Sequence, residues 1–341
     1  MSDQNLVKHM DELYLQNLPE LVPRDFLIVA LTDHYFGDDY VQDFQLPAHW
    51  GVSAKCRFTD DKSLIDDADA LWFHGPSIRW LPHKKVGQKW IVLSMESEQN
   101  YPFLRNSEIM SMFDLVMTYK LDSDIPCIYP NRQNYGTFQG APSCAKNKNL
   151  AHAHDVPNAP LVYIASNPVP RRDNFVSELM NHIKVDSLGA CLNNCSISGF
   201  GDRAGDWFKD VGQVLGRYKF YLAFENSLCD DYVTERVLMA LSFGCVPVYQ
   251  GAPNIEDFLP GEQCLIKVDD FNSPAHLAEY LNYLDQNDSA YDEYLSWRSS
   301  GLSLSFQQLL DVGSIEPKHR MMIKLLHDCD SNCNCGGRIR F

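Results

Sequence analysis

The chain has 341 residues, of which 45% are hydrophobic and 22% are charged, and its formal net charge is −16. This length allows two hydrophobic cores, because a single core stops growing near ~250–300 residues, and the composition excludes a wholly disordered chain. An acidic surface repels nucleic acid and anionic membranes, so we expect no nucleic-acid partner.

The apolar runs of the sequence are all far shorter than the roughly 20 residues that a membrane span needs. Its first residues are polar and acidic, which is not typical of a signal or transit peptide. We therefore predict no membrane span and a soluble chain, unless an anchor lies upstream. The 11 cysteines and the glycosylation patterns at Asn194 and Asn287 favour a secretory compartment for this chain.

The first half of the sequence alternates short apolar runs with amphipathic stretches, the pattern of α/β units with buried parallel strands. It predicts strands at residues 26–31, 70–73, 90–94 and 115–118. From about residue 136 to residue 160 the sequence has Gly, Ala, Pro and Asn but no periodicity, which is typical of a linker. We therefore predict a first domain at residues 1–150.

The second half restarts with a predicted strand at residues 161–165, followed by strands at 219–224, 246–249 and 264–268. Helices are predicted at 171–183, 234–243 and 274–284, with Pro274 in the first turn of the last one. This half is predicted to be a second domain, residues 151–310, before a Cys-rich tail, residues 311–341. Together the two halves predict an α/β fold of two Rossmann-like domains, in which ligands bind at the carboxyl ends of strands.

Polar residues gather where the predicted strand 219–224 ends and the next helix begins. The strand is followed by the polar residues 225–227, and the helix opens with Glu235 and Arg236. A helix N-terminus offers free N–H groups and a partial positive charge, which suits a diphosphate, and Arg236 adds a full cation. Glu235 cannot favour a phosphate, so it either binds a hydroxyl pair such as a ribose or only complements the helix dipole.

Four segments carry a more specific signal: YKFYLAFENSLCDDYVTER from residue 218, GCVPVYQGAPNIEDFLP from 244, VDDF from 268 and YLSWR from 294. Together they resemble the α1,3/α1,4-fucosyltransferase family, over roughly residues 71–298. The resemblance implies a GT-B fold with two Rossmann-like domains facing each other across a cleft, the first on the acceptor side and the second binding the donor. It also implies GDP-β-L-fucose as donor and inversion at the sugar carbon, with transfer to O3 of GlcNAc in a glycan or glycoprotein to give an α-fucoside.

The family's donor-binding positions can be carried over onto the densest of these segments. The resemblance assigns donor binding to Asn226, Tyr232 and Glu235, with Glu235 on the ribose. The family usually has Lys after that Glu, whereas this sequence has Arg236. Arg keeps the charge and can grip a diphosphate in bidentate fashion, but its shape differs from that of Lys.

A second cationic position follows the predicted strand 161–165, where Ser166-Asn167 precedes Arg171 and Arg172. Taken alone, these two arginines fit solvated surface cations. The family has Ser-Asn shortly before an Arg that contacts the donor phosphates, and counting back from Phe175 makes Arg172 the match. Arg171 stays an alternative, because this loop differs in length among relatives.

An inverting transfer needs a base for the proton of the acceptor hydroxyl. The predicted strand 90–94 runs into Met95-Glu96-Ser97-Glu98, which places Glu96 at the carboxyl end of a strand in the first domain. The family carries Glu-Ser after such a strand, and that Glu is its proposed base. We predict that Glu96 is the catalytic base, with Glu98 as the rival.

One acidic pair resembles the Asp-x-Asp motif that holds manganese in another glycosyltransferase fold, and a second pair could be read in the same way. Asp122-Ser-Asp124 lies in the first half, and Asp230-Asp231 lies near the donor segment. The resemblance places the first pair in a family stretch that binds no essential metal. We therefore expect no metal site and no cofactor, and GDP-fucose acts as a co-substrate.

The prediction is thus an α1,3-fucosyltransferase that uses GDP-fucose and a glycan or glycoprotein acceptor. The alternatives are a GT-B glycosyltransferase with another nucleotide sugar, or a catalytically silent sugar-binding protein of the same fold. Family members in animals, plants and fungi are usually anchored in the Golgi by an N-terminal span. We expect the Golgi lumen or membrane if an anchor is missing from this sequence, and otherwise a soluble cytoplasmic enzyme.

Overall fold

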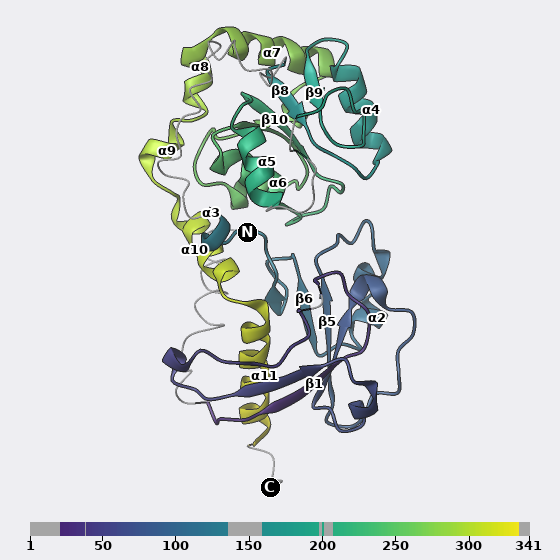
Figure 1. Ribbon diagram of the computed structural model, residues 1–341. Coiled ribbons are helices and arrows are strands. Elements are labelled where there is room, and N and C mark those ends of the chain that lie inside the picture. Colours follow the sequence, from purple (N-terminus) through teal and green to yellow (C-terminus); the bar gives the residue numbers. More distant parts are fainter. Residues whose placement is uncertain (1–20, 38, 136–158, 198–199, 201–206, 334–341) are drawn as a thin grey trace. The chain divides into compact units, whose positions relative to one another are not determined.

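The computed structural model describes residues 21–37, 39–135, 159–197, 200 and 207–333 (Figure 1). Its internal contacts divide the chain into two units: the first joins the residues up to Ile128 with those from Val312 onward, and the second runs from Tyr129 to Asp311. The internal contacts therefore divide the chain at other positions than the predicted boundaries, residues 150 and 310. Nearly all of the predicted linker, residues 136–158, lies outside the described residues.

A mostly parallel sheet forms the centre of the first unit. Its described strands are ordered β2-β3-β1-β4-β5-β6-β7, and only β2 runs antiparallel to its neighbour β3. Every residue of β4 is buried, as expected for a strand covered on both faces. The strands are β1 (Phe26–Ala30), β2 (Phe44–Gln45), β3 (Lys55–Thr59), β4 (Ala70–His74), β5 (Lys89–Ser94), β6 (Leu115–Thr118) and β7 (Ile125–Pro126).

The four strands predicted for the first half are confirmed as β1, β4, β5 and β6. The chain passes from β1 to β3 on one side of it and then to β4 on the other, so the topological switch point lies between β1 and β4. Besides several short 3₁₀ turns, this part of the chain contains the short helix α2 (Ser107–Met110), which begins with an Asn106 cap.

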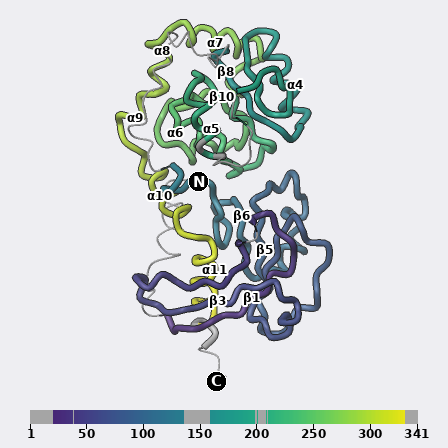
Figure 2. Tube along the Cα trace, in the orientation of Figure 1, coloured from purple at the N-terminus to yellow at the C-terminus, as the bar shows by residue number. Residues whose placement is uncertain are grey.

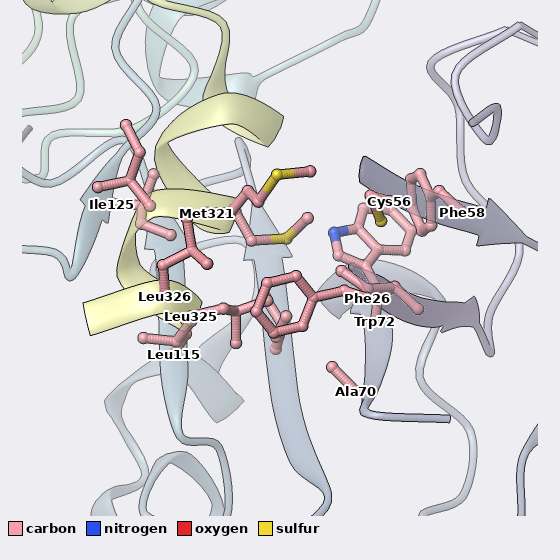
Figure 3. Packing of buried hydrophobic residues seen from close by; sticks show 14 of the residues in the cluster. Phe26, Cys56, Phe58, Ala70, Trp72, Leu115, Ile125, Met321, Leu325 and Leu326 are labelled. Carbon is pink, nitrogen blue, oxygen red and sulfur yellow. The ribbon is translucent and has the colours of Figure 1, made fainter. Parts of the chain in front are cut away.

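The last described helix, α11 (Pro317–Cys333), belongs to the core of the first unit rather than to a separate tail. Its buried residues recur at helical spacing as Met321, Met322, Leu325 and Leu326, and they join the cluster that contains Trp72 (Figure 3). In addition, the buried Arg320 guanidinium donates a hydrogen bond to the Pro126 carbonyl at 2.5 Å. The chain reaches this helix through α10 (Leu304–Ser314), coloured yellow-green in Figure 2.

The second unit contains a parallel sheet whose described strands are ordered β12-β11-β10-β8-β9. The chain goes from β8 to β9 on one side and then to β10 on the other, which places the topological switch point between β8 and β10. All predicted strands of this half are confirmed, with shorter bounds at some ends. They are β8 (Leu161–Tyr163), β10 (Phe220–Phe224), β11 (Val246–Gln250) and β12 (Ile266–Lys267), while β9 (Val185–Ser187) was not predicted.

Helices cover both faces of this sheet. On one face, α4 and α7 pack against Phe220, Leu222 and Phe224 of β10. Tyr221 points to the opposite face, where its hydroxyl accepts a hydrogen bond from Arg236 of α6. The described helices here are α3 (Arg132–Tyr135), α4 (Pro170–Leu179), α5 (Trp207–Leu215), α6 (Glu235–Ser242), α7 (Pro274–Gln286), α8 (Asp288–Glu293) and α9 (Trp297–Ser300).

The predicted helices of the second half are confirmed as α4, α6 and α7. Pro274 occupies the first turn of α7, and the Ser273 hydroxyl caps that helix by accepting a hydrogen bond from His276 N–H. Across all the described residues, no helix combines the length and apolar character that a membrane crossing requires.

Candidate functional site

Two guanidinium groups lie at the switch point of the second unit, where β8, β10 and β11 end. Arg236 Nη1 donates to the Ile164 carbonyl at 3.1 Å and to the Tyr221 hydroxyl at 3.3 Å. Arg171 Nη2 donates to the Glu225 carbonyl at 3.2 Å, and its Nη1 donates to the Gln250 side chain. These bonds fix two cations at adjacent carboxyl ends of a parallel sheet, where this class of fold binds its ligands.

The buried carboxylate of Glu225 connects these groups to the start of α6. It accepts a hydrogen bond from Thr234 N–H at 2.8 Å and from the Thr234 hydroxyl at 2.8 Å and 3.0 Å. Arg236 Nε lies 3.8 Å from Glu225 Oε2. Thr234 is the N-cap of α6, and its own side chain caps no helical N–H, so Glu225 supplies an acceptor at this helix end.

Burial raises the pKa of Glu225 from 4.5 to about 7, and the nearby Arg236 and Thr234 offset only part of that effect. The loop after β11 comes close to this carboxylate, because a Cβ at Gly251 would lie only 2.7 Å from Glu225 Cγ. Sequence reasoning recorded Glu225 only as one of three polar residues after a strand. A signal was available, since an acidic residue directly after a wholly apolar run is costly to bury unless it has partners.

The predicted phosphate ligand Arg172 lies inside the second unit, with 1% of its surface exposed. Its guanidinium donates to the Asn167 carbonyl at 2.7 Å and to the Phe224 carbonyl at 3.3 Å, and it lies over the Tyr163 ring. Arg171 is only half-buried. From α4 it is therefore Arg171, the alternative left open by the sequence, that reaches the strand ends with part of its side chain exposed.

The three positions assigned to the donor by resemblance lie along the chain between β10 and α6. Asn226 and Glu235 are half-buried, while Tyr232 is buried with 3% exposure. The intervening loop is held in place by Asn254, which bonds both the Asp231 N–H and the Asp231 carboxylate at 2.8 Å. Asp231 has a left-handed φ of 64°, a conformation that persists only where the surroundings fix it.

In the first unit, Glu96 and Glu98 both follow the carboxyl end of β5. Glu96 is half-buried, and its carbonyl accepts a hydrogen bond from the buried Ser94 hydroxyl at 3.1 Å. Glu98 is held by two ion pairs, to Lys120 at 2.6 Å and to Arg105 at 3.3 Å. Each oxygen of the Glu98 carboxylate thus lies beside a cation.

A cavity of about 250 Å³ lies beside Glu98 in the first unit, and Lys120, Asp122 and Asp124 also line it. Asp124, of the predicted Asp-x-Asp pair, accepts a hydrogen bond from Val116 N–H at 2.8 Å and so supports the loop after β6. Within the part of the chain that the structure describes, no group of three His, Cys, Asp or Glu side chains could hold a metal ion.

The switch point of the first unit carries aromatic rings that sequence reasoning missed. Tyr35 and Phe36 follow β1, are 76% and 37% exposed, and lie edge-on to His74 at 5.1 Å and 5.3 Å. Burial lowers the pKa of His74 to about 4, so this ring is neutral at physiological pH. Trp72 and Trp90 are core residues. The signal for the exposed rings was the sequence His-Tyr-Phe in the loop that follows a buried strand.

Comparison with known protein families finds two matching models. Residues 27–130 match the model "Fucosyltransferase, N-terminal", and residues 158–330 match "Glycosyltransferase family 10 (fucosyltransferase) C-term". Together these models cover both units, including every residue assigned above to the donor or to the base.

Curated relatives carry the name GDP-fucose protein O-fucosyltransferase 3. The protein from Danio rerio is 36% identical over 252 residues, which cover 72% of this chain and 55% of that protein. The Homo sapiens protein is 34% identical over 267 residues, covering 75% of this chain and 54% of that protein. The chain thus spans about half the length of these relatives.

Among solved structures, an α1,3-fucosyltransferase with GDP-fucose is similar to this chain with a TM-score of 0.56 and 16% sequence identity. The match covers 96% of this chain and 97% of that one. The same enzyme with GDP gives the same TM-score. This likeness shows the fold, which is GT-B, as the sequence predicted. From the family models and this fold, the chain belongs to glycosyltransferase family 10, the fucosyltransferases.

Proposed function

We propose that the chain transfers L-fucose from GDP-β-L-fucose to a hydroxyl group of a protein acceptor, with inversion at the sugar carbon. The observation that carries this proposal is the match of fucosyltransferase models to both units. The printed name of the curated relatives, protein O-fucosyltransferase, supports a hydroxyl of a protein as the acceptor. Transfer to O3 of GlcNAc, favoured by the motifs from residue 218 to residue 298, is the second candidate.

For the donor, we assign the diphosphate to the switch point of the second unit. Arg171 and Arg236 supply two cations there, and the start of α6 adds the partial positive charge of a helix N-terminus. Both stabilise the charge that develops on GDP as it departs. Asn226 follows β10 and Glu235 begins α6, and we assign Glu235 to the ribose hydroxyls.

Arg172 and Tyr232 are buried, so in this proposal they support the donor site without contacting the donor themselves. Arg172 holds the loop between β8 and α4 through the Asn167 carbonyl. It also binds the end of β10 through the Phe224 carbonyl. In this way it fixes the position from which Arg171 reaches the strand ends.

In the reaction, the acceptor oxygen attacks the anomeric carbon of fucose from the side opposite to GDP. The new carbon–oxygen bond forms as the bond to the β-phosphate oxygen breaks, and GDP leaves with the bonding electron pair. Glu96 accepts the proton of the acceptor hydroxyl. Because arginines balance the charge of the leaving group, we propose that the reaction needs no metal ion.

The experiment is a transfer assay with GDP-fucose and two acceptor sets, folded secreted protein domains without glycans and GlcNAc-terminated glycans, read by mass spectrometry. We expect fucose on the protein set, with the same rate in EDTA. Glu96→Gln should lower transfer by about 10²-fold or more, as expected when a general base is lost, while GDP-fucose still binds. The matched variant Glu98→Gln should keep most of the activity.

The other outcomes are equally specific. If only the glycan set carried fucose, the acceptor would be the second candidate, O3 of GlcNAc, and not a protein. Turnover of Glu96→Gln at the normal rate would remove Glu96 from the mechanism, and loss of activity in EDTA would overturn the metal-free proposal. If GDP-mannose or a UDP-sugar bound in preference to GDP-fucose, the assignment of GDP-fucose as donor would be wrong.

A further inference from the structure

The Glu225 carboxylate is an unusual group to find among the residues that face a diphosphate. It is 1% exposed, and an ionised carboxylate at such depth is costly unless a counter-charge lies close. The charged and titratable groups around it come from four elements. They are Arg236 and Glu235 of α6, Tyr221 of β10, Tyr249 of β11 and, through the Glu225 carbonyl, Arg171 of α4.

Arg236 is the cation nearest to this carboxylate, and it is shared between the interior and the site. Its Nε lies 3.8 Å from Glu225 Oε2, close enough for charge balance but longer than a hydrogen bond. The Arg236 side chain is 24% exposed, whereas that of Glu225 is 1% exposed. A diphosphate that approaches Arg236 from solvent therefore competes with Glu225 for the same positive charge.

We infer that Glu225 is the internal counter-ion of the donor site: above neutral pH it is ionised against Arg236 when the site is empty, and it takes up a proton when a nucleoside diphosphate sugar binds. The proton comes from the solvent and adds to a carboxylate oxygen, and no bond of the donor breaks in this step. Once neutral, Glu225 no longer competes for Arg236, whose charge then faces the diphosphate alone. This inference rests on the proposed function, since it requires a donor beside Arg236.

The hydrogen bonds around Glu225 suit both of its protonation states. Thr234 N–H donates to Oε1 in either state. The Thr234 hydroxyl donates to the ionised carboxylate and, by rotating, can accept from the protonated acid. Since burial raises the pKa of Glu225 to about 7, both states are accessible in the empty protein near neutral pH. An added anion near the group shifts it further toward the protonated form.

Calorimetric titration of the unchanged chain with GDP-fucose tests this inference. GDP-fucose is the right probe because its diphosphate is esterified at both ends and does not titrate near neutral pH, unlike that of GDP. At pH 7, titrations in two buffers of different ionisation enthalpy should show the uptake of about half a proton for each donor bound. At pH 8, this uptake should rise toward one proton. By linkage, the Kd should weaken about tenfold between pH 6.5 and pH 8.5.

Variants separate this role from structural support. Glu225→Gln has nearly the same shape but does not titrate, so its Kd should not change with pH and at pH 8.5 should be about tenfold tighter than that of the unchanged chain. Glu225→Asp keeps a titratable group and should keep a pH dependence. Glu256→Gln is the matched control, because Glu256 is an exposed carboxylate of the same unit that pairs with Lys267, and it should titrate like the unchanged chain.

Two results would overturn the inference while the proposed function stands: GDP-fucose binding without proton uptake, or a Glu225→Gln variant that binds more weakly with the pH dependence intact. If Glu225→Gln does not fold, the proton count on the unchanged chain decides alone. Failure of the unchanged chain to bind GDP-fucose at any pH would overturn the proposed function itself.

Discussion

Arg171 and Arg172 are neighbours in the sequence, yet their side chains lie in different surroundings. Arg172 shares the buried stripe of α4 with Val176 and Leu179, at spacings of four and seven residues, and Arg171 points about 100° away around the helix. Counting back from Phe175 in the sequence chose Arg172 and kept Arg171 as the alternative, because such a count does not show which side of the helix is buried. The choice depends on the phase of one helix, which only its packing on the sheet determines.

This difference predicts opposite consequences for one matched pair of variants. Arg171→Gln removes a charge at the strand ends, so GDP-fucose should bind about 10–100-fold more weakly while the free energy of unfolding hardly changes. Arg172→Gln removes buried hydrogen bonds and should lower the free energy of unfolding by about 3 kcal/mol. Calorimetric titration and urea denaturation measure the two effects. A large loss of binding in Arg172→Gln, with stability kept, would return the phosphate role to Arg172.

Among the secondary-structure elements, the sequence predicts best those with long apolar runs. The strands β4 and β10 have unbroken apolar runs, and both were predicted. The two-residue strands β2 and β7 leave no pattern long enough to read, and neither was predicted. The apolar spacing of α11 was present in the sequence, but spacing does not say which sheet a helix covers when that sheet lies some 200 residues earlier.

The packing of α11 predicts that the end of the described chain stabilises the first unit. Leu326 is 1% exposed, so Leu326→Ala should lower the free energy of unfolding by about 2–5 kcal/mol through lost burial and the cavity left behind. Lys324→Ala, in the same helix but only half-buried, is the control and should change stability by less than about 0.5 kcal/mol. Equal effects of the two variants in urea denaturation would show that the helix contributes little to the core.

For the whole molecule, the sequence predicts the fold class and the family more securely than the details of the site. Two sets of parallel strands, each with a switch point, follow from alternating apolar runs and account for the GT-B fold. Polar residues after a strand locate the donor loop, because the carboxyl ends of parallel strands meet at one edge. The sequence could not predict the packing of Tyr35 and Phe36 on His74 or the buried partners of Glu225, since both depend on contacts between distant segments.

Backbone hydrogen exchange with and without GDP-fucose tests most directly whether the donor binds at the switch point of the second unit. We expect slower exchange in residues 164–172 and 225–237, where β8 and β10 lead into α4 and α6, and no such protection in Arg171→Gln at the same donor concentration. If GDP-fucose binds while these two segments exchange as they do in the free protein, the donor lies elsewhere and this assignment is wrong.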